Sequence, residues 1–150
     1  MSGSATVARA GAAALAVLNL CWGAWARFRP RHFYDMFPGF GHRWTAAYPP
    51  YNEHLITDLG STFLTLGFLL AVGAVTTHLR IRRLVLAAVL LFNVLHLGFH
   101  LADRGTMTPF DFGASVTALA VGVVLPVLLL LVEAVPSRRA RTPGQRSRST

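Results

Sequence analysis

The chain has 150 residues, of which 53% are hydrophobic and 13% are charged, about half the roughly 25% charged share of a typical globular domain. Its formal net charge is +8, all of the basic residues are arginine, and Cys21 is the single cysteine. This composition excludes a soluble enzyme, a disordered protein and a disulfide-stapled secreted domain, and it predicts a small integral membrane protein.

Long apolar stretches follow one another along the chain, and each approaches the ~20 residues that a helix needs to cross hydrocarbon about 30 Å thick. They cover residues 10–26, 55–75, 84–101 and 112–132. Backbone groups in lipid must be satisfied within their own segment, and the stretches lack the period-two alternation of barrel strands, so we expect helices. The predicted fold is all-α: an antiparallel, up-down four-helix transmembrane bundle in one domain of residues 1–135. Its helices are expected at about 8–27, 53–77, 82–103 and 109–134.

The first stretch also has features of a signal peptide, because Ala24-Trp25-Ala26 resembles a small-x-small cleavage site. Against cleavage, Arg9 is the only basic residue before the stretch, and Trp22 and Trp25 stand where a polar region should precede the cut. We therefore predict a retained helix and keep cleavage as the alternative.

Residues 28–51 form an aromatic-rich segment with eight aromatic residues and four prolines. Residues 30–37 are expected to form a short helix in the headgroup layer, ended by Pro38-Gly39. Aromatic residues at this density are typical of a membrane interface. We interpret the segment as an aromatic belt that anchors an interfacial loop, and the alternative is a lid or binding surface over the mouth of the bundle.

Helix-capping signals mark two helix starts. Asn52 is expected to cap the helix that begins at Glu53, and Thr108 and Asp111 form a capping pair around Pro109. The second predicted helix also contains three glycines that are expected to allow close packing against a neighbouring helix: Gly60, Gly67 and Gly73.

Two further polar residues sit in or at the end of apolar stretches. Asn19 is predicted to make an interhelical hydrogen bond. Glu133 is predicted to pair with an arginine of the 80–83 segment.

Arginine placement predicts the orientation. With the N-terminus inside, nine arginines lie on the cytoplasmic side and five lie outside, so both termini are expected in the cytoplasm of a multi-pass cell-membrane protein. Residues 136–150 are expected to be a disordered, basic cytoplasmic tail that attracts anionic lipid headgroups. We expect the lipid bilayer, and a homo-oligomer or membrane protein, as partners, and no nucleic acid.

Polar residues gather at the predicted outer ends of the second and third helices. His54 and Asp58 are four residues apart and share a face with Ser61 and Thr65, while His96 and His100 repeat the spacing on the next helix. Antiparallel helices would bring both groups to the same side of the membrane. The predicted site consists of Glu53, His54, Asp58, His96, His100 and Asp103.

Imidazole and carboxylate groups on facing helices are ligands that zinc, copper or iron accepts, so we predict a transition-metal site. Haem fits less well, because the sequence shows no small residues lining a slot for it. The alternatives are a closed His–Asp hydrogen-bond network that holds the two helices together, and a relay for protons or a small ligand. The sequence identifies no catalytic residue.

The arrangement resembles the DoxX-like and related small bacterial membrane families. The resemblance lies in Phe28-Arg29-Pro30 through Phe37-Pro38-Gly39, in Asn52-Glu53-His54 and in Asp58-Leu59-Gly60, and it covers most of residues 10–132. It implies a four-helix membrane fold, in some members tied to redox-linked or stress roles, but no reaction. His96 and His100 have no counterpart in this resemblance.

Together these observations predict a small membrane protein whose outer polar cluster binds a metal and supports redox chemistry. The alternative is a non-catalytic accessory or interaction subunit in which the cluster is a structural hydrogen-bond network.

Overall fold

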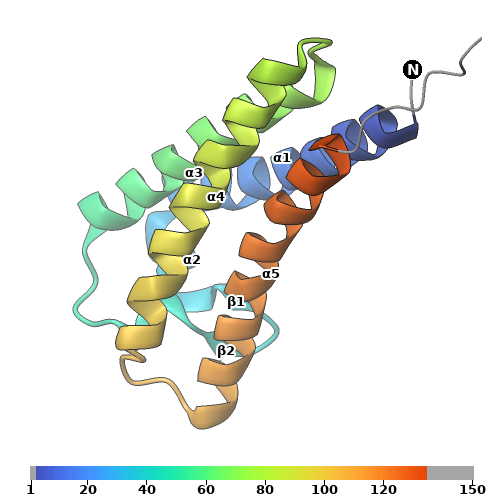
Figure 1. Cartoon of the computed structure of the whole chain (residues 1–150). Coiled ribbons are helices and arrows are strands. Elements are labelled where there is room, and N and C mark those ends of the chain that lie inside the picture. Colours follow the sequence, from blue (N-terminus) through green and yellow to red (C-terminus); the bar gives the residue numbers. More distant parts are fainter. Residues whose placement is uncertain (1–2, 135–150) are drawn as a thin grey trace, which may run out of the picture.

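The computed structural model describes residues 3–134, which are helical apart from one very short hairpin and the connecting loops (Figure 1). The predicted tail, residues 136–150, lies outside this part of the chain. The elements are, in order, α1 (Gly3–Phe28), α2 (Pro30–Met36), β1 (Pro38–Gly39), β2 (His42–Arg43), the 3-10 helix η1 (Thr45–Ala47), α3 (Glu53–Val75), α4 (Leu79–Ala102) and α5 (Pro109–Ala134).

Helices α1, α3, α4 and α5 are each long and apolar enough to cross a membrane, which fits the predicted multi-pass protein. Only 17–28% of the most apolar window of each helix is buried inside the protein. Most of their apolar side chains therefore lie on the outside of the protein, where the apolar interior of a bilayer would surround them. The predicted helix bounds differ most at the start of α1, which begins at Gly3 instead of about residue 8, and next between α3 and α4, where α4 begins at Leu79 instead of about residue 82. There the loop begins at Thr76, whose hydroxyl accepts a hydrogen bond from the amide of His78.

The closest helix packing joins α1 to α3 along a line of small residues. A side chain on Gly60 would lie 2.5 Å from the backbone nitrogen of Arg27, and one on Gly23 would lie 2.7 Å from the backbone nitrogen of Leu64. Gly67 is covered in the same way by Leu20. The predicted role of Gly60 and Gly67 is confirmed, while Gly73 makes only ordinary contacts with Val85 of α4.

Larger side chains fill the core that α4 and α5 share with this helix pair. Leu70 of α3, Leu86 and Val89 of α4, and Leu129 of α5 are buried in one cluster with Ala12 and Ala16 of α1. This cluster lies toward the end of the molecule where the α3–α4 loop meets the first turns of α1 and the last turns of α5. We call that end the termini end.

The opposite end carries the aromatic segment and is called here the cap end. Helix α2 confirms the predicted short helix, and its Phe33 and Tyr34 are buried with Ala26 of α1 and Ile56 of α3. The two-stranded hairpin β1–β2, which the sequence analysis did not predict, pairs Pro38 with Arg43. In Figure 1 the hairpin is seen between the lower parts of α4 and α5, and α2 lies behind α4. The segment therefore packs against the cap-end turns of α1 and α3, and its predicted place in the headgroup layer stays a prediction.

Three local predictions can be checked in the structure. Asn52 caps α3 by accepting a hydrogen bond from the amide of Leu55 (3.0 Å), and Thr108 and Asp111 form the predicted capping pair at the start of α5. The prediction for Asn19 is wrong: its amide donates to the carbonyl of Leu15 one turn earlier in α1, at 2.9 Å. That bond satisfies the side chain without a second helix.

The tight contact at Gly60 makes it sensitive to any side chain. We expect Gly60→Ala to lower the free energy of unfolding by about 1–3 kcal/mol, because the new methyl group meets rigid backbone of α1. The matched control is Gly98→Ala in α4, where nothing lies within 4 Å of the added methyl group and the helix gains propensity. Thermal unfolding of both variants in the same detergent compares them, and equal midpoints would contradict the packing described here.

Candidate functional site

The first candidate group is a polar stripe on α3, defined as His54, Asp58, Ser61 and Thr65. His54 Nε2 lies 3.3 Å from Asp58 Oδ2, one helical turn away. The two side chains are 88% and 62% exposed, so only one turn of their own helix supports them. Glu53, in the first turn of α3, is exposed as well.

The hydroxyl groups of the stripe are also exposed but are already hydrogen-bonded. Ser61 and Thr65 each donate to the backbone carbonyl four residues earlier, at 2.9 Å, and so does the neighbouring Thr62. Such back-bonding removes the cost of an unsatisfied hydroxyl in an apolar environment. The stripe thus presents small side chains with satisfied hydroxyls below one His–Asp pair.

The second predicted pair lies on α4. The rings of His96 and His100 are 4.8 Å apart, and His96 stacks on Phe92 one turn away. Both side chains are half-buried. His100 reaches Tyr48, which follows η1 in the cap, and the distance from its Nδ1 to the phenol oxygen is 2.8 Å.

The hydrogen positions in this contact follow from chemistry. The phenol of Tyr48 lies 2.7 Å from the backbone carbonyl oxygen of Asp103, which can only accept, so Tyr48 donates its one hydrogen there. Nδ1 of His100 must then donate to the phenol. Burial, and next the negative charge of Asp103, raise the pKa of Tyr48 above its usual value, which keeps the phenol protonated. The carboxylate of Asp103 accepts from the amide of Gly105 and shapes the loop before α5.

The six predicted residues therefore separate into two groups. Glu53, His54 and Asp58 are exposed on α3, while His96, His100 and Asp103 lie at α4 and the cap. Within residues 3–134, no group of three or more His, Cys, Asp or Glu side chains is placed to hold a metal ion. The predicted convergence in one chain is thus not found, and metal binding itself stays a prediction.

The reason is the rotation of α3 about its axis. At ~100° per residue, the stripe lies roughly 100–160° around the helix from Gly60, which faces α1. Phe63, whose ring meets Phe92 of α4, lies about 60° from Gly60 in the opposite direction. The glycine contacts with α1 therefore turn the stripe away from the histidines of α4.

Sequence reasoning missed a second polar cluster at the cap end. His42 Nδ1 lies 2.6 Å from Asp111 Oδ1, and the indole of Trp44 donates to the same oxygen at 3.2 Å. Thr108 donates to the other carboxylate oxygen at 2.7 Å. These contacts tie the β1–β2 hairpin to the start of α5. The capping motif marked Asp111 in the sequence, but no spacing signal linked it to a histidine 69 residues earlier.

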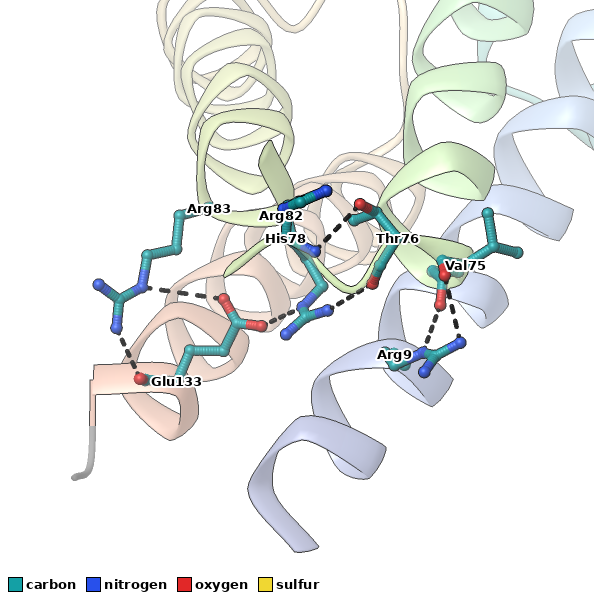
Figure 2. Close-up of polar contacts among 8 residues, drawn as sticks. Arg9, Val75, Thr76, His78, Arg82, Arg83 and Glu133 are labelled. Carbon is teal, nitrogen blue, oxygen red and sulfur yellow. Dashed lines mark hydrogen bonds and ion pairs between the residues drawn. The ribbon is translucent and has the colours of Figure 1, made fainter. Parts of the chain in front are cut away.

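A third cluster joins the four long helices at the termini end, as Figure 2 shows. Arg82 of α4 and Glu133 of α5 form a buried ion pair, with side chains 4% and 1% exposed, which confirms the predicted partner of Glu133. Arg82 also donates to the carbonyl of Thr76 at 3.1 Å, and Arg83 donates to the carbonyl of Glu133 at 2.6 Å. Arg9 of α1 reaches the end of α3.

The contacts of Arg9 and Thr76 satisfy helix-end carbonyl groups. Arg9 donates to the carbonyl oxygens of Ala74 and Val75 at 2.7 and 3.3 Å, and these oxygens have no partner further along α3. The arginines of the cluster thus close helix ends or neutralise Glu133, whose Oε2 accepts no hydrogen bond from residues 3–134 and lies 4.0 Å from Arg83 Nε. We interpret it as a structural lock.

No protein-family model, curated protein or solved structure matches the chain. The resemblance to DoxX-like proteins therefore stays a prediction that rests on the arrangement of the motifs.

Tyr48→Phe tests the link between the cap and α4. The variant loses both hydrogen bonds of the phenol, so we expect the free energy of unfolding to fall by about 1–2 kcal/mol. Amide hydrogen exchange should rise most in residues 103–108. In the unchanged chain, the raised pKa of Tyr48 gives a stability contribution that is complete below about pH 10, where the free phenol titrates, and lost as the pH rises further. Exchange in residues 103–108 that matches the unchanged chain would contradict this role.

Removing one partner of the buried ion pair should be far more damaging than removing both. Glu133→Ala leaves Arg82 buried without a counter-charge, and we expect a loss of about 3–5 kcal/mol. The double variant Arg82→Met with Glu133→Leu should recover most of this loss, and exposed Arg80→Met serves as the control. Unfolding in one detergent, monitored by circular dichroism, compares the three. A double variant no more stable than Glu133→Ala would show that the pair does not act as described.

Proposed function

We propose that the protein is a multi-pass membrane subunit that associates with another membrane-embedded helix through the polar stripe of α3. In this proposal the long helices form an antiparallel up-down bundle in the cell membrane, with both termini in the cytoplasm as the arginine distribution predicts. The cap end then lies outside.

The observation that carries the proposal is the exposure of Asp58 and His54. Asp58 is the sixth residue of α3, so it lies about 8 Å along the helix from its start. A carboxylate facing lipid is costly, with ~2.5–3.5 kcal/mol assigned to a charge at the centre of a spanning helix and less near its ends. Ionisable groups in spanning helices almost always face protein or water. In the described part of the chain, His54 is the only side chain paired with the Asp58 carboxylate. We therefore infer that a helix of another protein chain packs over this carboxylate.

The shape of the stripe supports the same conclusion. Ser61 and Thr65 continue it for two turns toward the middle of α3, and both are exposed. Small and hydroxyl side chains are enriched where spanning helices pack, because they let two backbones approach closely. The other outward-facing positions of the long helices are largely apolar, including Phe68, Leu95 and Val121. The stripe is thus a polar seam with two ionisable side chains on a largely apolar exterior.

The polar groups at the cap end have structural roles in this proposal. Tyr48, His100, His42 and Asp111 connect the cap to α4 and α5. The proposal shares the non-catalytic interaction subunit with the alternative of the sequence analysis, but it assigns His54 and Asp58 to the association surface instead of to a structural hydrogen-bond network.

The test places a photo-cross-linker on the stripe. Cys21, which is exposed, is first replaced in Cys21→Ser, and Ser61→Cys is then labelled with a benzophenone maleimide in native membranes. We expect a discrete adduct of higher mass that is lost in the additional variant Asp58→Leu, because the apolar side chain removes the need for a polar partner. The matched control is Leu95→Cys, an exposed apolar site on α4, away from the small and hydroxyl side chains of the stripe. Equal labelling patterns at the two sites would show that the stripe is not an association surface.

A further inference from the structure

We propose that the partner is a second copy of this chain, and that two α3 stripes close around one divalent transition-metal ion held by His54 and Asp58 of both copies. This inference rests on the proposed function, since it names the helix that covers the stripe. It also explains why the predicted metal ligands do not gather within a single chain.

The two donor atoms are already spaced for a metal. His54 Nε2 and Asp58 Oδ2 are 3.3 Å apart. In a tetrahedral zinc site with bonds of about 2.0–2.1 Å, two adjacent ligand atoms lie roughly 3.3 Å from each other. The spacing of these two atoms therefore matches two corners of a tetrahedral site, which small side-chain rotations would complete.

A single chain supplies only these two corners, and a closed zinc site needs four. A two-fold axis beside α3 brings the same two residues from the second copy, because such an interface is formed by one surface patch meeting itself. The resulting set has two imidazoles and two carboxylates, a ligand type that zinc accepts. His96 and His100 do not compete for this role, since Nδ1 of His100 is hydrogen-bonded to Tyr48 and both rings lie on another face.

Charge favours the metal-bridged pair over a bare one. Two Asp58 carboxylates brought together at an interface would repel each other in a low-dielectric environment. A divalent cation with two carboxylates and two neutral imidazoles has no net charge, so the electrostatic cost of burial falls. The stripe is thus complementary to its own copy only when the ion is present, and metal and association should be coupled.

The rest of the stripe allows the approach that the site needs. Ser61 and Thr65 follow Asp58 along the interface, and their hydroxyls donate to their own helix. Two such surfaces can meet without leaving unsatisfied polar groups.

The experiment uses the full chain in lipid nanodiscs assembled after EDTA treatment. Zn²⁺ is added, bound metal is measured by elemental analysis, and the oligomeric state by native mass spectrometry. We expect one zinc per two chains and a dimer that EDTA disperses. His54→Ala and Asp58→Asn should each weaken zinc binding by at least about 10–100-fold, the loss that even outer-shell changes cause, and should abolish the dimer. His78→Ala, at an exposed histidine at the other end of the molecule, is the control and should change neither.

Cobalt gives a second readout, because tetrahedral Co²⁺ absorbs strongly in the visible range and octahedral Co²⁺ does not. The inference is overturned if zinc binding in His54→Ala equals that of the unchanged chain, or if the zinc-loaded protein is monomeric. The photo-cross-link at Ser61→Cys separates this failure from that of the proposed function. An adduct that persists after EDTA would reject the metal bridge and leave the association surface standing, whereas loss of the adduct at Asp58→Leu with zinc still bound would reject the bridge alone.

Discussion

The cost of leaving a polar group without a partner in apolar surroundings governs this structure, because more than half of the residues are hydrophobic and few charges are present. At the termini end that cost is met by the buried pair of Arg82 and Glu133. At the cap end, Asp111 accepts from several side chains of the cap and its own helix start, and Tyr48 closes the end of α4. The exposed stripe of α3 is different, since His54 and Asp58 find support only within one turn of their own helix. A partner that packs over these two side chains would therefore remove the cost of exposing them to lipid.

Packing decides where that stripe faces. Gly23 and Gly60 allow α1 and α3 to approach until a side chain on either would meet backbone. This contact sets the rotation of α3, because only the face with the glycines can come so close. The core with α4 uses larger side chains such as Leu70 and Leu86, which tolerate a wider separation. The small residues of one helix pair thus control the exposure of polar residues on the opposite side of α3.

The aromatic segment connects the helices at the cap end. Phe33 and Tyr34 bury themselves against α1 and α3, while Tyr48 bonds to α4. The segment therefore links the cap-end halves of α1, α3 and α4. In the metal-bridged dimer that we propose, each chain would supply two of the four ligands from its exterior, His54 and Asp58. In that proposal metal binding would strengthen dimer formation, and dimer formation would strengthen metal binding.

Composition and apolar stretches of about 20 residues were sufficient to predict the four spanning-length helices, because the backbone in lipid has few alternatives to a helix. Local signals predicted what depends on neighbouring residues, including the Asn52 cap, the Thr108–Asp111 pair and the short helix after Pro30. Only the tertiary structure decided the rotation of α3, the His42–Asp111 contact and the separation of His54 from His96. These depend on contacts between residues far apart in the chain, such as Gly60 against Arg27, and a periodic pattern shows which residues share a face without showing what that face meets.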